Sequence, residues 1–353
     1  MTAFHLSRLP IVQAPMAGSQ GADLAIAVCR AGGLGSIPAA MLAPDALRAE
    51  IAKIRAATDA PFNVNFFAHR APAPSAEDER RWRAALGGYY REFGIDPATI
   101  PAGPGRAPFD ETLCAIVEET RPPVVSFHFG LPDDALVARV KQAGAKVWSS
   151  ATTVAEARWL EERGVDAIIA QGREAGGHRG MFLCDDIEAQ PGLFALLPQV
   201  VDAVRVPVIA AGGVADGRGV AAALALGAGA AQIGTAYLLT PQATTAPLHR
   251  AALRAARDDA TRLTNVYTGR PARGLLTRLM REQGPMSANA PAFPLATGAV
   301  APLRAAAEKS GSCDFSPVWS GEAGALAREE DAGALTLRFW DEARRVTGGL
   351  RLE

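Results

Sequence analysis

The residue types best suited to chemistry stand together in one glycine-rich segment, residues 171–180, which reads Gln-Gly-Arg-Glu-Ala-Gly-Gly-His-Arg-Gly. Within it, His178 follows the pair Gly176-Gly177. Glycine lets the backbone lie flat against a planar ligand. Near neutral pH, imidazole can accept a proton, or in its protonated form attract an anion. We predict that His178 is catalytic and contacts the substrate; a core histidine with both nitrogens hydrogen-bonded is the alternative.

The remaining candidates carry weaker signals. His128 stands in an apolar run, residues 125–129, and can equally well line a substrate pocket or pack in the core. Arg179 could bind an anion, although an internal salt bridge is the commoner role for such an arginine. We expect structural or surface positions for the other three histidines, and core positions for two neighbouring phenylalanines: His5, His69, His249, Phe66 and Phe67.

A second glycine pattern indicates a phosphate site. Gly212-Gly213 precedes a predicted helix that begins near Asp216, and Gly234-Thr235 follows a later apolar run. Glycine lets backbone amides approach an anion, and a helix N-terminus favours negative charge. Loops after the last two strands of a β/α barrel commonly bind phosphate. A simple tight turn between strand and helix is the alternative for Gly212-Gly213.

The elements that position these residues form a repeated pattern along the chain. Short apolar runs alternate with segments of 3.6-residue periodicity, which is typical of parallel βαβ units. The predicted helices span residues 22–30, 44–57, 134–143, 154–163 and 216–226. The eight predicted strands span residues 11–16, 34–38, 62–67, 124–129, 146–150, 167–171, 208–211 and 231–235. Eight units predict an α/β fold of the (β/α)8 TIM-barrel type, with an open doubly wound sheet as the rival.

Two regions interrupt this pattern. We expect the barrel to comprise residues 1–70 and 120–243, and residues 71–119 and 244–353 to form a smaller, mainly helical second lobe. Helical patterns occupy residues 76–90, 244–257 and 272–282, no further strand is expected after Pro241, and residues 284–302 are predicted to form a proline-rich loop.

Composition excludes several classes of protein. The chain has 353 residues and a formal net charge of −1, so no nucleic acid or anionic membrane partner is expected. Its four cysteines are scattered, which argues against a metal site or disulfides and favours a cytoplasmic protein. The uncharged stretch 219–248 is long enough to cross a membrane, but its glycines and Gln232 favour a buried helix, turn and strand.

Several of these motifs together resemble the nitronate monooxygenase family. The resemblance covers roughly the first 240 residues and continues in residues 268–274; its motifs lie at residues 13–16, 62–67, 171–180 and 232–235. It implies an FMN-binding barrel. Carried over by motif, the residues that would contact FMN are Ala14, Pro15, Met16, Asn65, Gln171, Gly176, Gly177, Gly212, Gly213, Gln232, Gly234 and Thr235. His178 would face the substrate, beside His128.

The resemblance also implies an activity: oxidation of alkyl nitronates, such as propionate 3-nitronate, by O2 to a carbonyl compound and nitrite, in a monomer or homodimer. NAD(P)H-dependent flavin reductases of the quinone or enoyl-acyl-carrier-protein type share the barrel and are the alternative. A flavin-free barrel that binds a sugar phosphate is a third possibility. The sequence departs from the family near its C-terminus, where Trp319-Ser320-Gly321-Glu322 replaces the usual Trp-x-Gly-Gln and residues 284–311 are hard to match.

Overall fold

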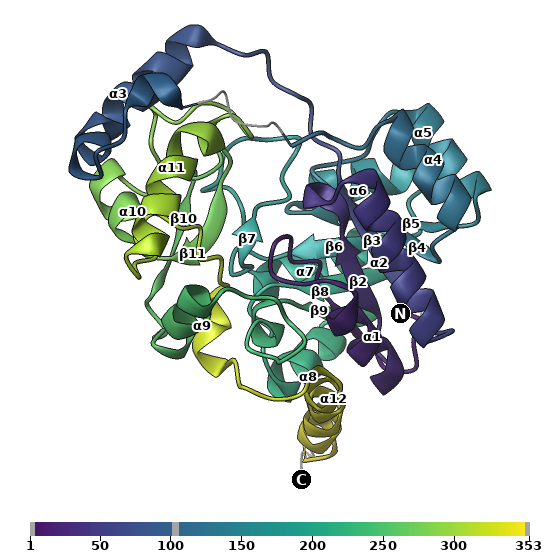
Figure 1. The fold of residues 1–353 in the computed structure, drawn as a ribbon. Coiled ribbons are helices and arrows are strands. Elements are labelled where there is room, and N and C mark those ends of the chain that lie inside the picture. Colours follow the sequence, from purple (N-terminus) through teal and green to yellow (C-terminus); the bar gives the residue numbers. More distant parts are fainter. Residues whose placement is uncertain (1–3, 101–105, 350–353) are drawn as a thin grey trace.

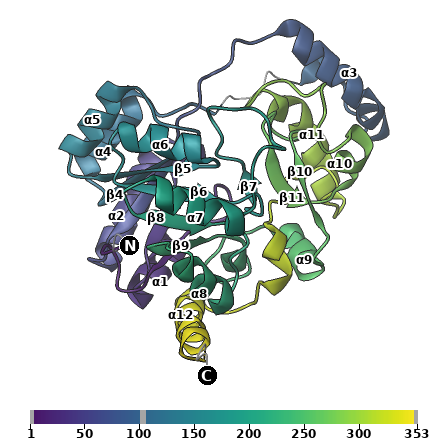
Figure 2. The same ribbon diagram turned by 180° about the vertical axis from the view of Figure 1, so that it is seen from behind.

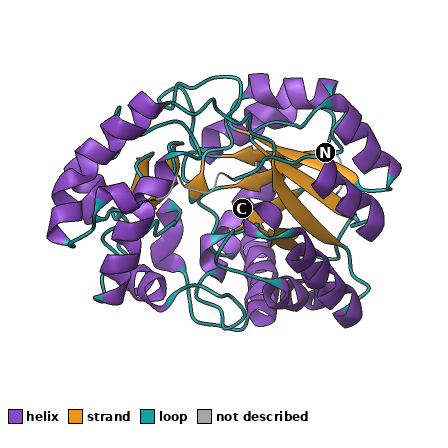
Figure 3. Cartoon of the chain, turned by 45° about the horizontal axis from the view of Figure 1, so that its top comes forward, coloured by secondary structure: helices purple, strands orange, loops and turns teal. Residues whose placement is uncertain are grey.

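The computed structural model describes residues 4–100 and 106–349. Its centre is an eight-stranded sheet in which every neighbouring pair is parallel, in the order β1-β9-β8-β6-β5-β4-β3-β2. Figure 3 shows strands at the centre of the molecule with helices around them. A parallel bridge between Val12 and Leu34 brings the two edges together. The strands are β1 (Ile11–Gln13), β2 (Gly35–Pro38), β3 (Phe62–Phe67), β4 (Val124–His128), β5 (Lys146–Ala151), β6 (Ala167–Gln171), β8 (Val208–Ala211) and β9 (Ala230–Ile233). The predicted barrel is confirmed, and the open sheet is excluded.

Two apolar layers explain why these runs form strands. Alternate side chains fill the barrel interior, where Trp148 and Ile209 belong to one buried cluster. The residues between them face outward, and Ile168 and Ala210 pack with the surrounding helices. A strand buried on both faces reads as a continuous apolar run, which is the pattern seen in the sequence.

Seven helices of the described chain cover the barrel, and the C-terminal helix joins them (Figures 1 and 2). Helix α4 packs on α2 and α5, and α12 packs on α8 and α1, so both lie on the barrel although the sequence pattern predicts their residues in the second lobe. The bounds are α1 (Ala22–Ala31), α2 (Pro44–Ala57), α4 (Glu111–Thr120), α5 (Asp134–Gln142), α6 (Val154–Glu162), α7 (Leu193–Ala203), α8 (Gly217–Ala225) and α12 (Ala332–Gly349). No helix in the described residues is long and apolar enough to span a membrane.

The smaller lobe joins the insertion to the C-terminal third of the chain. Helix α3 (Ala76–Glu92) packs on α11 (Ala296–Lys309), and the Trp82 indole donates a hydrogen bond to the Ala296 carbonyl at 3.2 Å. Tyr90 donates to the Ala299 carbonyl at 2.7 Å. The remaining pieces are η2 (Pro97–Thr99), α9 (Pro247–Arg254), α10 (Arg278–Gln283) and η4 (Glu322–Leu326).

The expectation that strands stop after Pro241 is wrong. Strands β10 (Thr261–Thr264) and β11 (Ala272–Leu275) pair antiparallel, and β11 also pairs with β7 (Gly177–His178). Part of the segment predicted as helix, residues 272–282, is therefore a strand, and α11 begins inside the predicted loop 284–302. This small sheet attaches the histidine segment directly to the second lobe.

Candidate functional site

One pocket opens at the C-terminal ends of the barrel strands. Every residue predicted to contact cofactor or substrate lines it: Ala14, Pro15, Met16, Asn65, His128, Gln171, Gly176, Gly177, His178, Gly212, Gly213, Gln232, Gly234 and Thr235. These residues come from six different strand ends or the loops that follow them. Six separately weak sequence signals thus converge on one site.

Buried amide side chains fix the first wall of the pocket. Gln13 is fully buried; its Nε2 donates to Gln20 Oε1 at 2.7 Å, and its Oε1 accepts from the Ser36 amide at 2.9 Å. Gln20 Oε1 also accepts from the Met16 amide at 2.9 Å. The Ala14–Met16 loop is therefore held on the end of β1, with Met16 directed at Gly234, where an added Cβ would lie 3.7 Å from the Met16 sulfur.

The backbone of His178 is held by two side chains from neighbouring strands. Gln171 Nε2 donates to the His178 carbonyl at 2.9 Å, and His128 Nε2 donates to the same oxygen at 3.1 Å. Because His128 Nε2 carries a proton, its Nδ1 accepts from Ser150 Oγ at 2.9 Å. Burial lowers the pKa of His128 to about 4, so this ring stays neutral. His128 both lines the pocket and positions His178.

The His178 imidazole is buried among aromatic rings. Its ring centroid lies 5.3 Å from that of Phe293 and 5.5 Å from that of Trp319. Its Nε2 contacts Thr268 Oγ1 at 2.9 Å, and that hydroxyl donates to the Arg270 carbonyl at 3.4 Å. The hydroxyl therefore accepts from Nε2–H, which leaves Nδ1 as the proton-accepting nitrogen.

The electrostatics of this position decide the charge of His178. Burial lowers its pKa well below the usual value of 6.5, and the positive charge of Arg106 lowers it further. The imidazole is neutral near pH 7. Of the two roles considered for His178, a neutral proton acceptor fits this environment and a protonated anion attractor does not.

A glycine cradle forms the opposite wall. Gly212 has φ 116° and Gly213 has φ 68°, values that favour glycine. A Cβ on Gly176 would lie 2.5 Å from the Gly321 amide nitrogen, so this approach of two backbones requires glycine. By contrast, a Cβ on Gly177 would meet nothing within 4 Å, because this residue borders open space.

The predicted phosphate donors need one correction. Asp216 caps α8 by accepting from the amides of Arg218 and Gly219, and Glu342 accepts from the Gly217 amide at 3.0 Å. Two carboxylates thus occupy the N-terminus of α8, which disfavours an anion there. The short helix η3 (Thr235–Tyr237) begins at the pocket instead, and the first amides of a helix have no partner within it.

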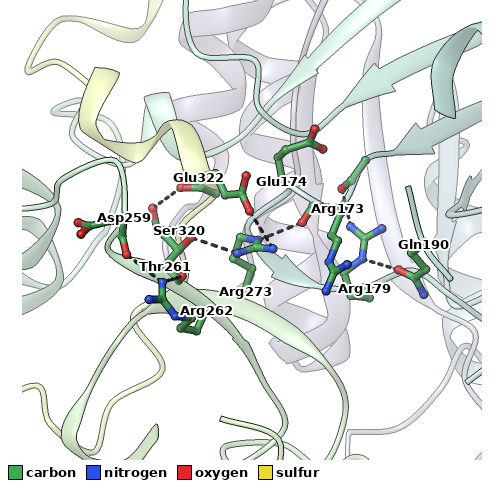
Figure 4. Close-up of polar contacts among 12 residues, drawn as sticks. Arg173, Glu174, Arg179, Gln190, Asp259, Thr261, Arg262, Arg273, Ser320 and Glu322 are labelled. Atoms are coloured by element: carbon green, nitrogen blue, oxygen red, sulfur yellow. Dashed lines mark hydrogen bonds and ion pairs between the residues drawn. The ribbon is translucent and has the colours of Figure 1, made fainter. Parts of the chain in front are cut away.

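The C-terminal part of the chain closes this wall. The Gly321 amide donates to Thr235 Oγ1 at 2.9 Å, and the Glu322 amide donates to the Glu174 carbonyl at 3.0 Å. Arg273 forms an ion pair with Glu322 at 3.0 Å and donates to the Arg173 carbonyl at 3.0 Å (Figure 4). The Thr235 hydroxyl hydrogen stays available for a ligand, because its oxygen acts as the acceptor toward Gly321.

Arg179 has a structural role rather than either expected one. Its side chain is fully buried and donates to the carbonyls of Gln171 and Gly172 at 2.8 and 2.6 Å, and to Gln190 Oε1 at 2.8 Å (Figure 4). Burial lowers its pKa to about 10. Arg179 clamps the two ends of the histidine segment together, and it neither binds an anion in the pocket nor forms a salt bridge.

Sequence motifs do not predict several of the pocket residues. Phe67 lines the pocket rather than only packing in the core, and His249 lines it while its Nε2 donates to the Trp319 carbonyl at 2.9 Å. Trp319 itself belongs to the motif that departs from the expected pattern. Arg106 also lines the pocket, and its glycine- and proline-rich surroundings give no local signal. The described residues contain no cluster of three or more potential metal ligands.

Comparison with known proteins agrees with the motifs. The family model described as nitronate monooxygenase matches residues 1–337. Nitronate monooxygenases of Paraburkholderia phytofirmans and Pseudomonas aeruginosa are 40% and 41% identical, and the alignments cover 97% and 95% of this chain and 94% and 96% of those proteins.

Solved structures agree as well. A nitroalkane oxidase from Streptomyces ansochromogenes is 41% identical with a TM-score of 0.89, and the match covers 98% of this chain and 99% of that one. FabK from Thermotoga maritima is 28% identical with a TM-score of 0.72, over 98% of this chain and 96% of that one. With its barrel, its histidine segment and its pocket in place, the chain belongs to the nitronate monooxygenase family of oxidoreductases.

Proposed function

We propose that this enzyme oxidises alkyl nitronates, such as propionate 3-nitronate, with O2 and bound FMN, to give a carbonyl compound and nitrite. The observation that carries the proposal is a single pocket in which His178 lies with a glycine cradle and with the unpartnered Oε1 of Gln232. The similarity to nitronate monooxygenases and to a nitroalkane oxidase supports the same chemistry.

The pocket fits a flat, phosphorylated cofactor. Gln232 borders it, and its Oε1 is a buried acceptor with no hydrogen-bond partner among the described residues. Such an orphaned group indicates a ligand that donates to it. Gly213, Gly234 and Thr235 would supply amides for a phosphate, and Asn65 would contact the cofactor. A bound flavin would supply the electron-accepting chemistry that no amino-acid side chain offers.

The protein side chains then have defined tasks. His178 presents Nδ1 as a proton acceptor, which a neutral nitroalkane needs and an anionic nitronate does not. Its carbonyl is fixed by Gln171 and His128, so the ring keeps one orientation. The aromatic rings of Phe67, Phe293 and Trp319 surround the imidazole and exclude water from it.

Two measurements test this proposal. Heat-denatured protein should release a yellow compound with the mass of FMN; release of FAD, or of no flavin, contradicts the cofactor. Anaerobic mixing with propionate 3-nitronate should reduce the flavin spectrum quickly, and mixing with NADH should do so slowly. No GxGxxG fingerprint follows a strand in this sequence, in keeping with slow reduction by NADH.

The reductase alternative is decided by the same comparison. The likeness to FabK, at 28% identity and a TM-score of 0.72, shows that the fold extends beyond the nitronate enzymes. Rapid anaerobic bleaching by NADH, with a slow response to nitronate, moves the assignment to an NAD(P)H-dependent flavin reductase.

A further inference from the structure

Arg106 is a cation in the pocket without an anionic partner. Its guanidinium lines the cavity, and no carboxylate within the described residues lies at ion-pair distance from it. None of its side-chain nitrogens makes a hydrogen bond to the described part of the chain either; the guanidinium carbon lies 5.8 Å from the centre of the Phe293 ring. Burial lowers the pKa of Arg106, which reflects the cost of holding a charge there.

The neighbouring charges do not compensate this cation. Arg270 is a second positive group that acts on His178, and the carboxylates of Asp185 and Glu156 stabilise Arg270 rather than Arg106. The other titratable groups nearby are histidines whose pKa values burial lowers, so they carry no negative charge. Buried charges in proteins are paired or hydrogen-bonded, since an isolated one is costly. Arg106 is half-buried and the described residues offer it no counter-charge, so an anionic ligand in the pocket would be its partner.

The residues that follow Arg106 are anchored at the end of β3. The Phe109 amide donates to the Phe67 carbonyl at 2.7 Å. The Phe109 ring lies 4.8 Å from the Phe66 ring and 5.2 Å from the Phe127 ring, both in edge-on geometry. Arg106 is three residues before this anchor. Both Arg106 and His178 approach the Phe293 ring, so the cation and the proton acceptor face the same volume.

We propose that Arg106 is the specificity-determining residue of this site: it binds the negative charge of the substrate, so that the enzyme takes the nitronate anion in preference to the neutral nitroalkane. The inference rests on the proposed function, and it assigns charge recognition and proton acceptance to two different side chains. Arg106 supplies charge, and His178 supplies a neutral proton acceptor.

The test compares one substrate in two charge states. Wild type, Arg106→Gln and Arg106→Lys are assayed with ethyl nitronate and with freshly dissolved neutral nitroethane. Arg106→Gln should raise KM for the nitronate roughly ten- to a hundredfold and change KM for nitroethane less than about threefold, because nitroethane carries no negative charge until His178 has removed its proton. Arg106→Lys should recover most of the nitronate activity. The matched control is Arg257→Gln, which removes an exposed, ion-paired arginine outside the pocket.

A binding measurement separates this inference from the proposed function. Nitrate, a planar anion that the enzyme does not oxidise, is titrated into each holoenzyme while the flavin absorbance is followed. Nitrate binding weakened by roughly tenfold or more in Arg106→Gln, with unchanged flavin content, supports the anion site even if wild type fails to oxidise nitronates. Equal nitrate affinity in wild type and Arg106→Gln, or an equal rise in KM for both substrates, overturns the role of Arg106.

Discussion

Three histidines in or near the pocket share one electrostatic property. Burial lowers the pKa of His69 and of His128 to about 4, and it lowers that of His178 well below its usual value. At His69 a backbone contact with Arg106 opposes this shift of the pKa only in part. At the scale of residues the site combines neutral imidazoles with Arg106, for which the described residues provide no carboxylate partner. Charge selection and proton acceptance therefore belong to different side chains.

The lowered pKa values predict how stability depends on pH. Above about pH 6.5 both the folded and the unfolded chain keep these histidines neutral. Below about pH 6.5 the histidines of the unfolded chain become protonated, whereas those of the folded chain stay neutral. The free energy of unfolding therefore falls as pH falls, by at most about 1.4 kcal/mol per pH unit for each histidine. The fall continues to about pH 4 for His69 and His128.

Urea unfolding at about pH 7.5, 6.5 and 5.5 checks this expectation. His69→Leu should reduce the slope between the two lower pH values, since one proton-binding site of the unfolded chain is gone. The exposed His5→Gln is the control. Identical slopes in wild type and His69→Leu would show that His69 is protonated in the folded protein.

His178→Asn tests the neutral proton acceptor directly. The variant should fold and retain flavin, because the carbonyl that Gln171 and His128 hold is unchanged. For an anionic nitronate, loss of a neutral hydrogen bond should lower kcat/KM by roughly tenfold or less. For a neutral nitroalkane, loss of the base should lower it by roughly a hundredfold or more. Unchanged kinetics with both forms would place His178 outside the reacting volume.

At the scale of elements, periodicity predicts most of the barrel. Its eight strands and five of its helices come within a few residues of the observed bounds, because each run has a local apolar pattern. Periodicity does not predict the small sheet, because β10 and β11 are four residues each and carry exposed or charged side chains. The pairing of β11 with β7 also joins segments far apart in sequence. Helix α7 contains Pro198, which masks its helical pattern.

Sequence motifs likewise predict only part of the candidate site. Glycine and histidine motifs identify the pocket residues on the strand ends, since those ends converge in any such barrel. Arg106 and Trp319 lie outside the repeated βα units of the barrel, so only the tertiary structure shows that they line the pocket. The charge of His178 also cannot be predicted from sequence, because it depends on burial and on Arg106.

The next prediction concerns flavin binding and the turn after β8. Gly213→Asp should abolish or strongly weaken flavin binding, because it places an anion where the phosphate is proposed to bind, and Gly213→Asn should weaken it much less. Aspartate and asparagine have nearly the same volume, and each would have to adopt the φ of 68° seen at Gly213. Asparagine tolerates such a φ comparatively well. Flavin content after gel filtration and the dissociation constant for added FMN give the comparison. Equal losses in the two variants would assign the effect to backbone strain instead of charge.

At the scale of the whole molecule, the C-terminal helix is packed tightly on the barrel. A Cβ on Gly217 would collide with the Cβ of Glu342 and lie 2.5 Å from the Ala343 amide nitrogen. Since α8 and α12 make the most extensive helix–helix contact in the described chain, this close approach ties α12 to the barrel. The described C-terminal residues thus help to hold both the barrel and, through residues 319–322, the pocket.

Two glycine-to-alanine changes should act in opposite directions. Gly217→Ala should destabilise the protein by about 1–3 kcal/mol, because α12 must move to admit the methyl group. Gly88→Ala, in the exposed middle of α3 where a Cβ meets nothing within 4 Å, should stabilise it by up to about 1 kcal/mol. Thermal unfolding of both variants measures the difference. A lowered Tm for Gly88→Ala, or an unchanged one for Gly217→Ala, contradicts this description of the packing.

The route of the chain around the pocket has a consequence for biosynthesis. The wall begins at Ala14 and is completed by Ala323, in a chain of 353 residues. A ribosome must therefore translate the message as far as Ala323 before both walls of the pocket exist. The amides of Gly321 and Glu322, which close the site against Thr235 and Glu174, emerge long after the first wall. A shorter nascent chain has no complete site in which to retain a flavin, so we expect loading to follow translation of residues 319–323 rather than to guide the barrel as it forms.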